Sequence, residues 1–152
     1  MMDSRDLLTL HPVVRTRFLA VRTEYYNATG YQLLVTSTRR DEEMQAFLYA
    51  QGRTRPGKIV TNAKAGESAH ELGIAVDAYP MIGGKIVWIS DGDKDGKIDQ
   101  CWLIYGEIAT KHGFSWAGNW KGKLVELPHI QFTGGYTVRD LFNNKSLMDN
   151  FK

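Results

Sequence analysis

The sequence predicts an α+β fold in which a small antiparallel sheet is flanked by helices. Apolar side chains recur at helical spacing near the N-terminus, at Val14, Phe18, Val21 and Tyr25. Short apolar runs at residues 31–37 and 74–76 have the length and composition of strands. A glycine pair at positions 83 and 84 lies between Met81-Ile82 and Lys85-Ile86-Val87-Trp88 and predicts a tight hairpin. Because a hairpin joins antiparallel strands, it favours an antiparallel sheet.

The first half of the chain is expected to fold as helix, strand and helix. Pro12 suits the first turn of the first helix, and Gly30 ends that helix. After the strand, acidic residues 41–43 suit the N-terminus of a second helix, which Gly52 ends. Its buried side is predicted to consist of Met44, Phe47 and Leu48. Residues 53–66, rich in Gly, Lys and Thr, are expected to form a loop.

The second half is expected to hold the remaining strands and a third helix. The run 74–76 predicts a buried strand, and Asp77 is expected where the chain leaves it. Asp99 suits the N-cap of a helix that runs to His112. A cation at a helix C-terminus is favoured by the dipole, so His112 is interpreted as structural. A short helix is predicted around residues 138–142.

The composition is that of an ordinary globular protein. The 152 residues suffice for one domain with a core but not for two, so residues 1–152 are expected to form a single domain. The formal net charge of +2 is too small to predict nucleic-acid binding, and no stretch approaches the length of a membrane span. The single cysteine, Cys101, excludes an internal disulfide and is expected to be a buried, inert thiol.

Three side chains have the chemistry of a catalytic zinc site. His70 precedes Asp77 by seven positions, and His129 follows much later in the chain. Two histidines and one aspartate are a standard ligand set for a zinc ion that keeps its fourth position for water. Glu126, three residues before His129, would be placed to handle the proton of that water. His70, Asp77 and His129 are therefore candidate zinc ligands, and Glu126 is the candidate general base.

A structural role is the competing explanation for each histidine taken alone. A lone histidine at a strand end is more often hydrogen-bonded than metal-bound. The H-E-x-x-H motif is also absent, because Ile74 stands where its second histidine would be and Gly73 disfavours a continuing helix. Glu71 is accordingly a poor candidate for the base.

Longer motifs around these residues resemble a known family. Residues 68–77 have the pattern Ser-x-His-x-x-Gly-x-Ala-Val-Asp, and residues 126–131 have the pattern acid-x-Pro-His-x-Gln. Both are similar to the VanY-like zinc peptidases that cut bacterial cell-wall peptides, and especially to the L-alanyl-D-glutamate endopeptidases of phage endolysins and bacterial wall hydrolases. Further similarity lies in segments 45–54, 56–61 and 113–121. The resemblance implies a hedgehog/D-Ala-D-Ala peptidase-like zinc fold, zinc as cofactor and the L-Ala–D-Glu bond of peptidoglycan as substrate.

The resemblance also implies roles for two further residues. The family places an arginine five residues before the glutamine of the second helix, and Arg40 and Gln45 match that spacing. Arg40 would then hold a substrate carbonyl or carboxylate, whereas a solvated surface arginine beside Arg39 is the alternative. Gln131 lies on the same strand face as His129 and is a candidate partner of the metal ligands. The chain would be a monomeric catalytic domain with no separate cell-wall-binding domain, acting on peptidoglycan peptides without binding nucleic acid or membranes.

Two other functions compete with the endopeptidase. A D-Ala-D-Ala-type or D-Asp-type carboxypeptidase would use the same metal ligands and differ in how the cleft treats a terminal carboxylate. A non-catalytic zinc-containing binding domain is the alternative from a different class, since the signalling domain of hedgehog proteins carries this ligand set. Retention of Glu126 and Arg40 disfavours the binding domain, because an inert module needs neither.

An acidic loop at residues 91–99 has the spacing of an EF-hand. Ligand positions 1, 3, 5, 7 and 9 fall on Asp91, Asp93, Asp95, Lys97 (through its carbonyl) and Asp99. Gly96 occupies the turn position, but position 12 is Trp102 in place of the usual bidentate glutamate. The pattern predicts a weak Ca²⁺ site with a regulatory or structural role. A solvated, charged link is the alternative.

The N-terminal residues carry acids and lack a basic segment followed by an apolar run of signal-peptide length. We therefore expect a protein made in the host cytoplasm without a signal peptide. It would act on the bacterial cell wall after release through a holin-type pore, as a phage endolysin does in host lysis.

Overall fold

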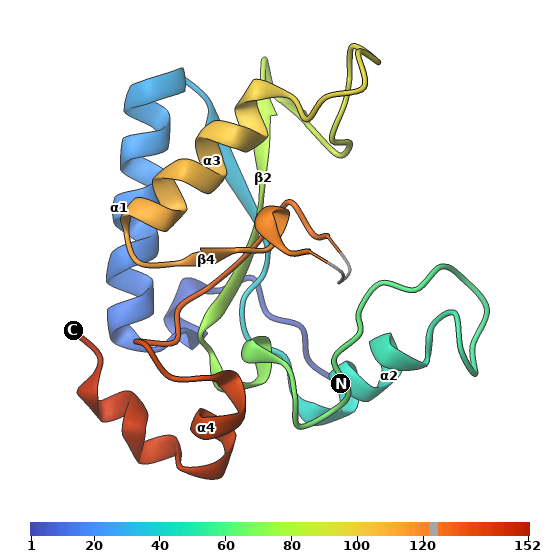
Figure 1. Cartoon of the computed structure of the whole chain (residues 1–152), viewed down its shortest axis with the longest axis vertical. Helices are drawn as coiled ribbons and strands as arrows, with labels where there is room; N and C mark the ends of the chain where they lie inside the picture. Colours follow the sequence, from blue (N-terminus) through green and yellow to red (C-terminus); the bar gives the residue numbers. More distant parts are fainter. Residues whose placement is uncertain (122–124) are drawn as a thin grey trace.

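An antiparallel sheet forms the centre of the computed structural model, which describes residues 1–121 and 125–152 (Figure 1). Its strands are β1 (Gln32–Ser37), β2 (Ala75–Ile82), β3 (Lys85–Ile86), β4 (Ser115–Trp116) and β5 (His129–Gln131). Their order is β1-β2-β5-β4, and β3 pairs with the far end of β2 across the predicted glycine hairpin. The pairings between these strands are all antiparallel, which confirms the predicted α+β class.

The helices begin and end close to their sequence signals. They are α1 (Pro12–Thr29), α2 (Glu42–Ala50), α3 (Gln100–Lys111) and α4 (Val138–Asn143), with 3₁₀ turns at Leu7–Thr9, Ala69–Leu72, Ala117–Asn119 and Lys145–Asn150. Pro12 is the first residue of α1, and Gly30 caps its end with a φ of 74° in the left-handed region. No helix in the described ranges is long and apolar enough to cross a bilayer.

The apolar core lies where α1 and α3 meet the sheet. In Figure 1 these two helices lie on one side of β2, while α2 lies on the other. The Tyr25 hydroxyl of α1 donates to the backbone carbonyl of Cys101 in α3 at 3.0 Å, which joins the two helices inside the core. Cys101 is buried as predicted, and burial raises the pKa of its thiol. This packing makes the helical side of the sheet a rigid support for β2.

The strand register brings two of the candidate ligands together. Asp77 on β2 pairs directly with His129 on β5 and with Ser37 on β1. The prediction that the chain leaves the strand at Asp77 is wrong, because β2 continues to Ile82. The strand is longer than its apolar run since β5 pairs with residues 75–77 and β1 pairs with residues 77–81. Asp77 therefore lies inside the sheet, where both neighbouring strands fix its backbone.

The buried side of α2 also differs from the prediction. Its fully buried residue is Gln45, whereas Phe47 is 40% exposed and packs under the Arg55 guanidinium, which lies 3.5 Å from the ring centroid. The Gln45 side chain donates to the Ala63 carbonyl at 2.8 Å and accepts from Arg40 at 3.3 Å. Helical periodicity identifies an apolar face only where a helix packs on an apolar core, and α2 instead packs on polar groups of the loop.

Trp116 fixes the segment that leads into β5. Its indole lies against Gly106 of α3 and against Gly118, and a Cβ atom at either glycine would overlap with the ring. The indole Nε1 donates to the backbone carbonyl of Leu127 at 2.7 Å. The buried tryptophan thus holds the backbone between Glu126 and His129 against α3.

Replacement of Gly106 by alanine is expected to destabilise the fold by about 1–3 kcal/mol, because the added methyl overpacks the Trp116 site. Glu107→Ala is the matched control, since Glu107 is the next residue of α3 and is exposed. Thermal or urea unfolding of both variants measures the difference. Equal unfolding midpoints for Gly106→Ala and Glu107→Ala would contradict the packing of Trp116 on this glycine.

Candidate metal centre and active site

His70, Asp77 and His129 converge on one point. His70 Nε2 and Asp77 Oδ1 lie 3.2 Å apart, His129 Nδ1 and Asp77 Oδ1 lie 3.1 Å apart, and the two ring nitrogens are 3.2 Å apart. In a tetrahedral zinc site with bonds of 2.0–2.1 Å, ligand atoms are separated by about 3.3–3.4 Å. The three atoms therefore form a triangle of nearly the size that zinc requires, and their donor set fits that metal.

Both imidazoles are oriented by the nitrogen that faces away from the cluster. His70 Nδ1 donates to the Thr38 carbonyl at 2.6 Å, and a carbonyl oxygen can only accept, so the proton is on Nδ1. His129 Nε2 lies 2.9 Å from Gln131 Oε1, which accepts in the same way. Each ring is thereby held in the tautomer that directs a lone pair into the cluster, an arrangement typical of metal-bound histidines. Gln131 thus contacts the outer nitrogen of His129.

A capped 3₁₀ turn positions His70. The Ser68 hydroxyl accepts from the His70 backbone N–H at 3.2 Å, and the Glu71 carboxylate accepts from the Ser68 N–H at 3.0 Å. Glu71 also accepts from the Gly66 N–H at 2.9 Å. The turn ends at Gly73, which has a φ of 71° and where a Cβ atom would lie only 3.0 Å from the Thr9 carbonyl oxygen. Glu71 is therefore a capping residue, in agreement with its dismissal as the base.

Arg40 is held inside the site. Its side chain is only 12% exposed, which excludes the alternative of a solvated surface arginine. Nη2 donates to Asp77 Oδ2 and Nη1 donates to Gln45 Oε1, both at 3.3 Å, while Nε lies 3.3 Å from Asp3 Oδ2 in an ion pair without hydrogen-bond alignment. Arg40 thus binds the Asp77 oxygen that faces away from the imidazoles.

Two of these contacts were not foreseen from the sequence. Asp3 forms an isolated antiparallel bridge with Arg40, and its carboxylate also accepts from the Ser37 hydroxyl. The Thr38 carbonyl that orients His70 is a backbone group. No sequence pattern could have indicated either contact, because an aspartate near the N-terminus and a main-chain carbonyl oxygen are ordinary features of any sequence.

The charges of the site depend on this pairing. Burial alone raises the pKa of Asp77, but the charges and hydrogen bonds of His70 and His129 outweigh burial and hold that pKa well below its usual value. Burial lowers the pKa of His70, which favours the neutral ring that a metal ligand requires. Burial raises the pKa of Glu126, partly offset by the charge of His129. The centre therefore combines an ionised aspartate with a glutamate that is more basic than usual.

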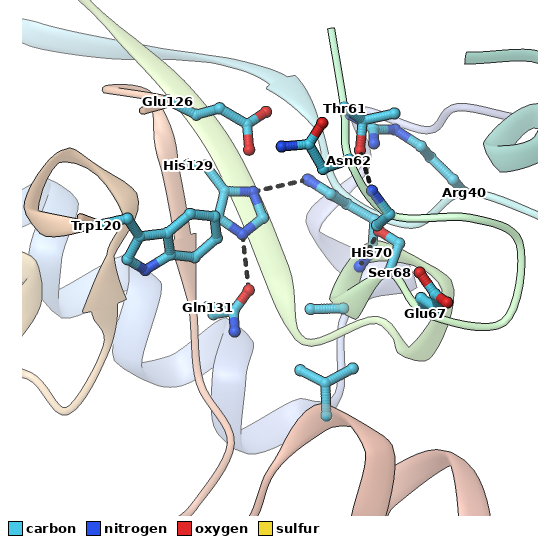
Figure 2. A pocket seen from close by; sticks show the side chains of 13 residues that line it. Arg40, Thr61, Asn62, Glu67, Ser68, His70, Trp120, Glu126, His129 and Gln131 are labelled. Carbon is cyan, nitrogen blue, oxygen red and sulfur yellow. Dashed lines mark hydrogen bonds between the residues drawn. The ribbon is translucent and has the colours of Figure 1, made fainter. Parts of the chain in front are cut away.

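Glu126 lines the same pocket as the metal cluster. Figure 2 shows its carboxylate beside His129 and directed into the pocket, whose far wall carries Asn62 and Arg40. The Trp120 indole packs against the His129 ring at a centroid distance of 5.4 Å and forms part of the wall. A carboxylate that faces a metal cluster without belonging to its three converging atoms has the position of a proton acceptor.

The acidic loop forms a smaller cluster than the EF-hand pattern predicts. Asp91, Asp93 and Asp99 offer oxygen atoms within 4.8 Å of one another, whereas the Asp95 carboxylate accepts from the Lys97 N–H at 2.8 Å. A hydrogen bond to Asp91 raises the pKa of Asp93. Asp99 is the N-cap residue of α3, but its side chain accepts from the Gly92 N–H at 2.7 Å and does not cap the helix. Calcium binding at this loop stays a prediction.

The sheet, the His-Asp-His cluster and the half-buried glutamate beside it define the site of a metallopeptidase. Comparison with known proteins agrees with that class. Residues 61–132 match the family model described as D-alanyl-D-alanine carboxypeptidase. The chain is 40% identical over 125 residues to the peptidoglycan L-alanyl-D-glutamate endopeptidase CwlK of Bacillus subtilis (strain 168), a match that covers 80% of this chain and 72% of CwlK. The protein belongs to this peptidase family.

Two solved structures share the fold. The L-Ala D-Glu endopeptidase ChiX of Serratia marcescens superposes with a TM-score of 0.56 at 23% identity, covering 87% of this chain and 89% of ChiX. The D,D-pentapeptidase VanY from the VanB-type resistance cassette, solved as an E175A mutant in complex with Zn(II), superposes with a TM-score of 0.55 at 16% identity, covering 93% and 83%. These matches confirm the expected resemblance and the fold class.

Alanine substitution of any one of the three converging residues is expected to abolish tight zinc binding, because two remaining ligands cannot complete the site. His112→Ala is the matched control, since that histidine lies at the end of α3 beside Glu24. Elemental analysis of purified protein should find one zinc per chain in the wild type and in the control. Full zinc occupancy in His70→Ala, Asp77→Ala and His129→Ala would contradict the assignment of these residues as zinc ligands.

Proposed function

We propose that the protein is a zinc-dependent endopeptidase that hydrolyses the L-Ala–D-Glu bond of peptidoglycan stem peptides. The observation that carries the proposal is the triangle of His70 Nε2, Asp77 Oδ1 and His129 Nδ1 beside Glu126. The 40% identity to an endopeptidase of this specificity supports the choice of bond. His70, Asp77 and His129 would hold the zinc, which when bound polarises a substrate carbonyl and acidifies water.

Glu126 is assigned the proton transfers. Its carboxylate accepts a proton from the attacking water as the oxygen of that water bonds to the L-Ala carbonyl carbon. The same proton then passes to the nitrogen of D-Glu as the C–N bond breaks, so the carboxylate is regenerated. The position of Glu126 in the pocket next to His129 supports this role.

Arg40 is assigned a positioning role together with an electrostatic one. The guanidinium has five N–H donors, of which two bind Asp77 and Gln45, while Asp3 forms an ion pair beside Nε. These contacts hold Asp77 in the orientation that directs Oδ1 at both imidazoles. Because Arg40 also lines the pocket, its remaining N–H groups are available to a substrate carbonyl oxygen.

A carboxypeptidase is the second candidate, favoured by the family model that matches residues 61–132. The endopeptidase is preferred because its supporting relative matches 125 residues at 40% identity. A non-catalytic zinc-containing domain is disfavoured, since it would not require Glu126 in the pocket. The role in phage lysis, the release through a holin-type pore and the calcium site at residues 91–99 stay predictions of the sequence.

Digestion of purified sacculi, followed by mass spectrometry, separates these functions. The endopeptidase should release stem peptides that begin at D-Glu and leave L-Ala on the glycan, whereas a carboxypeptidase would release a free terminal amino acid. Glu126→Gln is expected to keep the zinc and the fold and to lose about 10²- to 10⁴-fold in rate, as removal of a general base does.

Glu107→Gln, an exposed substitution on α3, is the control for that variant. Digestion by Glu126→Gln at the wild-type rate would remove Glu126 from the mechanism. Release of a free C-terminal amino acid as the sole product would replace the endopeptidase by the carboxypeptidase.

A further inference from the structure

A second groove continues from the catalytic pocket on the Asp77 side of the metal cluster. It shares Arg40, Thr61 and Glu126 with the pocket, so the two form one cleft that passes the candidate metal ligands. Beyond the shared residues its walls are mostly apolar and aromatic, and include Ile59, Val60, Tyr79, Trp88, Trp102 and Val125. The residues named for catalysis account for only one end of this cleft.

Trp88 is the most exposed of the large apolar side chains that line the groove. Its relative exposure is 61%, whereas a tryptophan ordinarily buries most of its surface. The indole packs on the Tyr79 ring at a centroid distance of 4.9 Å and an interplanar angle of 58°, which supports it from one side. Two other apolar lining residues, Ile59 and Val60, are 46% and 40% exposed. An exposed apolar surface beside an active site is typical of a region that contacts a bound ligand.

The charges in the groove select against an anionic ligand. Among the described residues that line it, Asp3, Asp77 and Glu126 carry carboxylates, and Arg40 is the cation between them. The opposite end of the cleft has a different rim. There Glu67 adds a carboxylate to the lining, and two cations lie next to lining residues: Arg53 donates to the Asn62 side chain at 3.2 Å, and Lys64 follows Ala63.

The two ends of the proposed substrate differ in charge. On the amino side of the scissile bond, the L-Ala nitrogen is acylated by the lactyl group of N-acetylmuramic acid, so this side ends in an uncharged sugar. On the other side, D-Glu carries a free carboxylate. The neutral sugar matches the groove with the aromatic wall, where Asp3, Asp77 and Glu126 would repel the D-Glu carboxylate.

We propose that this groove is a subsite for the N-acetylmuramoyl group of the substrate, a proposal that rests on the function proposed above. Trp88 is the platform on which the pyranose ring stacks through its C–H face, supported by Tyr79. Ser90, which also lines the groove, offers a hydroxyl to the sugar hydroxyls. The enzyme thus recognises the bond together with its attachment to the glycan.

The test compares two substrates that share one peptide and differ only in the acyl group on L-Ala. One carries N-acetylmuramic acid through its lactyl group, and the other carries a plain acetyl group. Trp88→Ala is expected to lower kcat/KM about tenfold for the sugar-bearing substrate, the usual scale of a lost aromatic contact, and to leave the acetyl substrate within about twofold. Ile89→Ala is the matched control, because Ile89 is the next residue, is 59% exposed and does not line the groove.

Equal losses of kcat/KM on both substrates would assign the groove to the peptide. No loss on either substrate would leave Trp88 without a role. Both results would overturn the proposal. A Trp88-dependent dimer in sedimentation, with unchanged kinetics, would assign the groove to a second copy and overturn it as well. Binding of N-acetylmuramoyl-L-alanine and of N-acetyl-L-alanine to the zinc-loaded wild type provides a readout without catalysis. Equal affinities contradict the subsite even if Trp88→Ala misfolds, whereas failure to cleave either substrate contradicts the proposed function instead.

Discussion

The carboxylate of Asp77 is the group on which the rest of this site depends. Its Oδ1 lies within 3.2 Å of a nitrogen on each of the two imidazoles, and its Oδ2 accepts from Arg40. A carboxylate with 16% side-chain exposure is costly to desolvate unless it is paired and hydrogen-bonded. The fold supplies these partners from three separate parts of the chain. The same contacts that stabilise the buried charge also form the geometry that a zinc ion needs.

Two kinds of support hold Asp77, one on each side of the sheet. On the helical side, the apolar core between α1, α3 and β2 fixes the backbone of the strand. On the open side, support is polar: Arg40 is held by Gln45 and Asp3, and Gln45 in turn holds the loop at Ala63. This division explains why α2 buries a glutamine. The helix belongs to a hydrogen-bonded shell around the site and contributes no residue to the buried apolar core of the described chain.

The parts of the site that the sequence predicts are those with a side-chain signature. Two histidines and an aspartate in recognisable motifs identify the cluster, and strand alternation places Gln131 beside His129. The Thr38 carbonyl and the Asp3 carboxylate could not be found in this way, because their roles arise from contacts between distant segments. The end of β2 was missed for a related reason. Its residues after Asp77 are held by pairing with β1, which an apolar run of three residues does not reveal.

X-ray absorption at the zinc K-edge of the purified protein tests the central claim most directly. The account predicts one zinc per chain with two imidazole nitrogens and carboxylate or water oxygens at about 2.0–2.1 Å, in a tetrahedral arrangement. A zinc–sulfur distance of about 2.3 Å, or a spectrum without imidazole scattering, would contradict it. So would a protein that binds no zinc while its fold is intact.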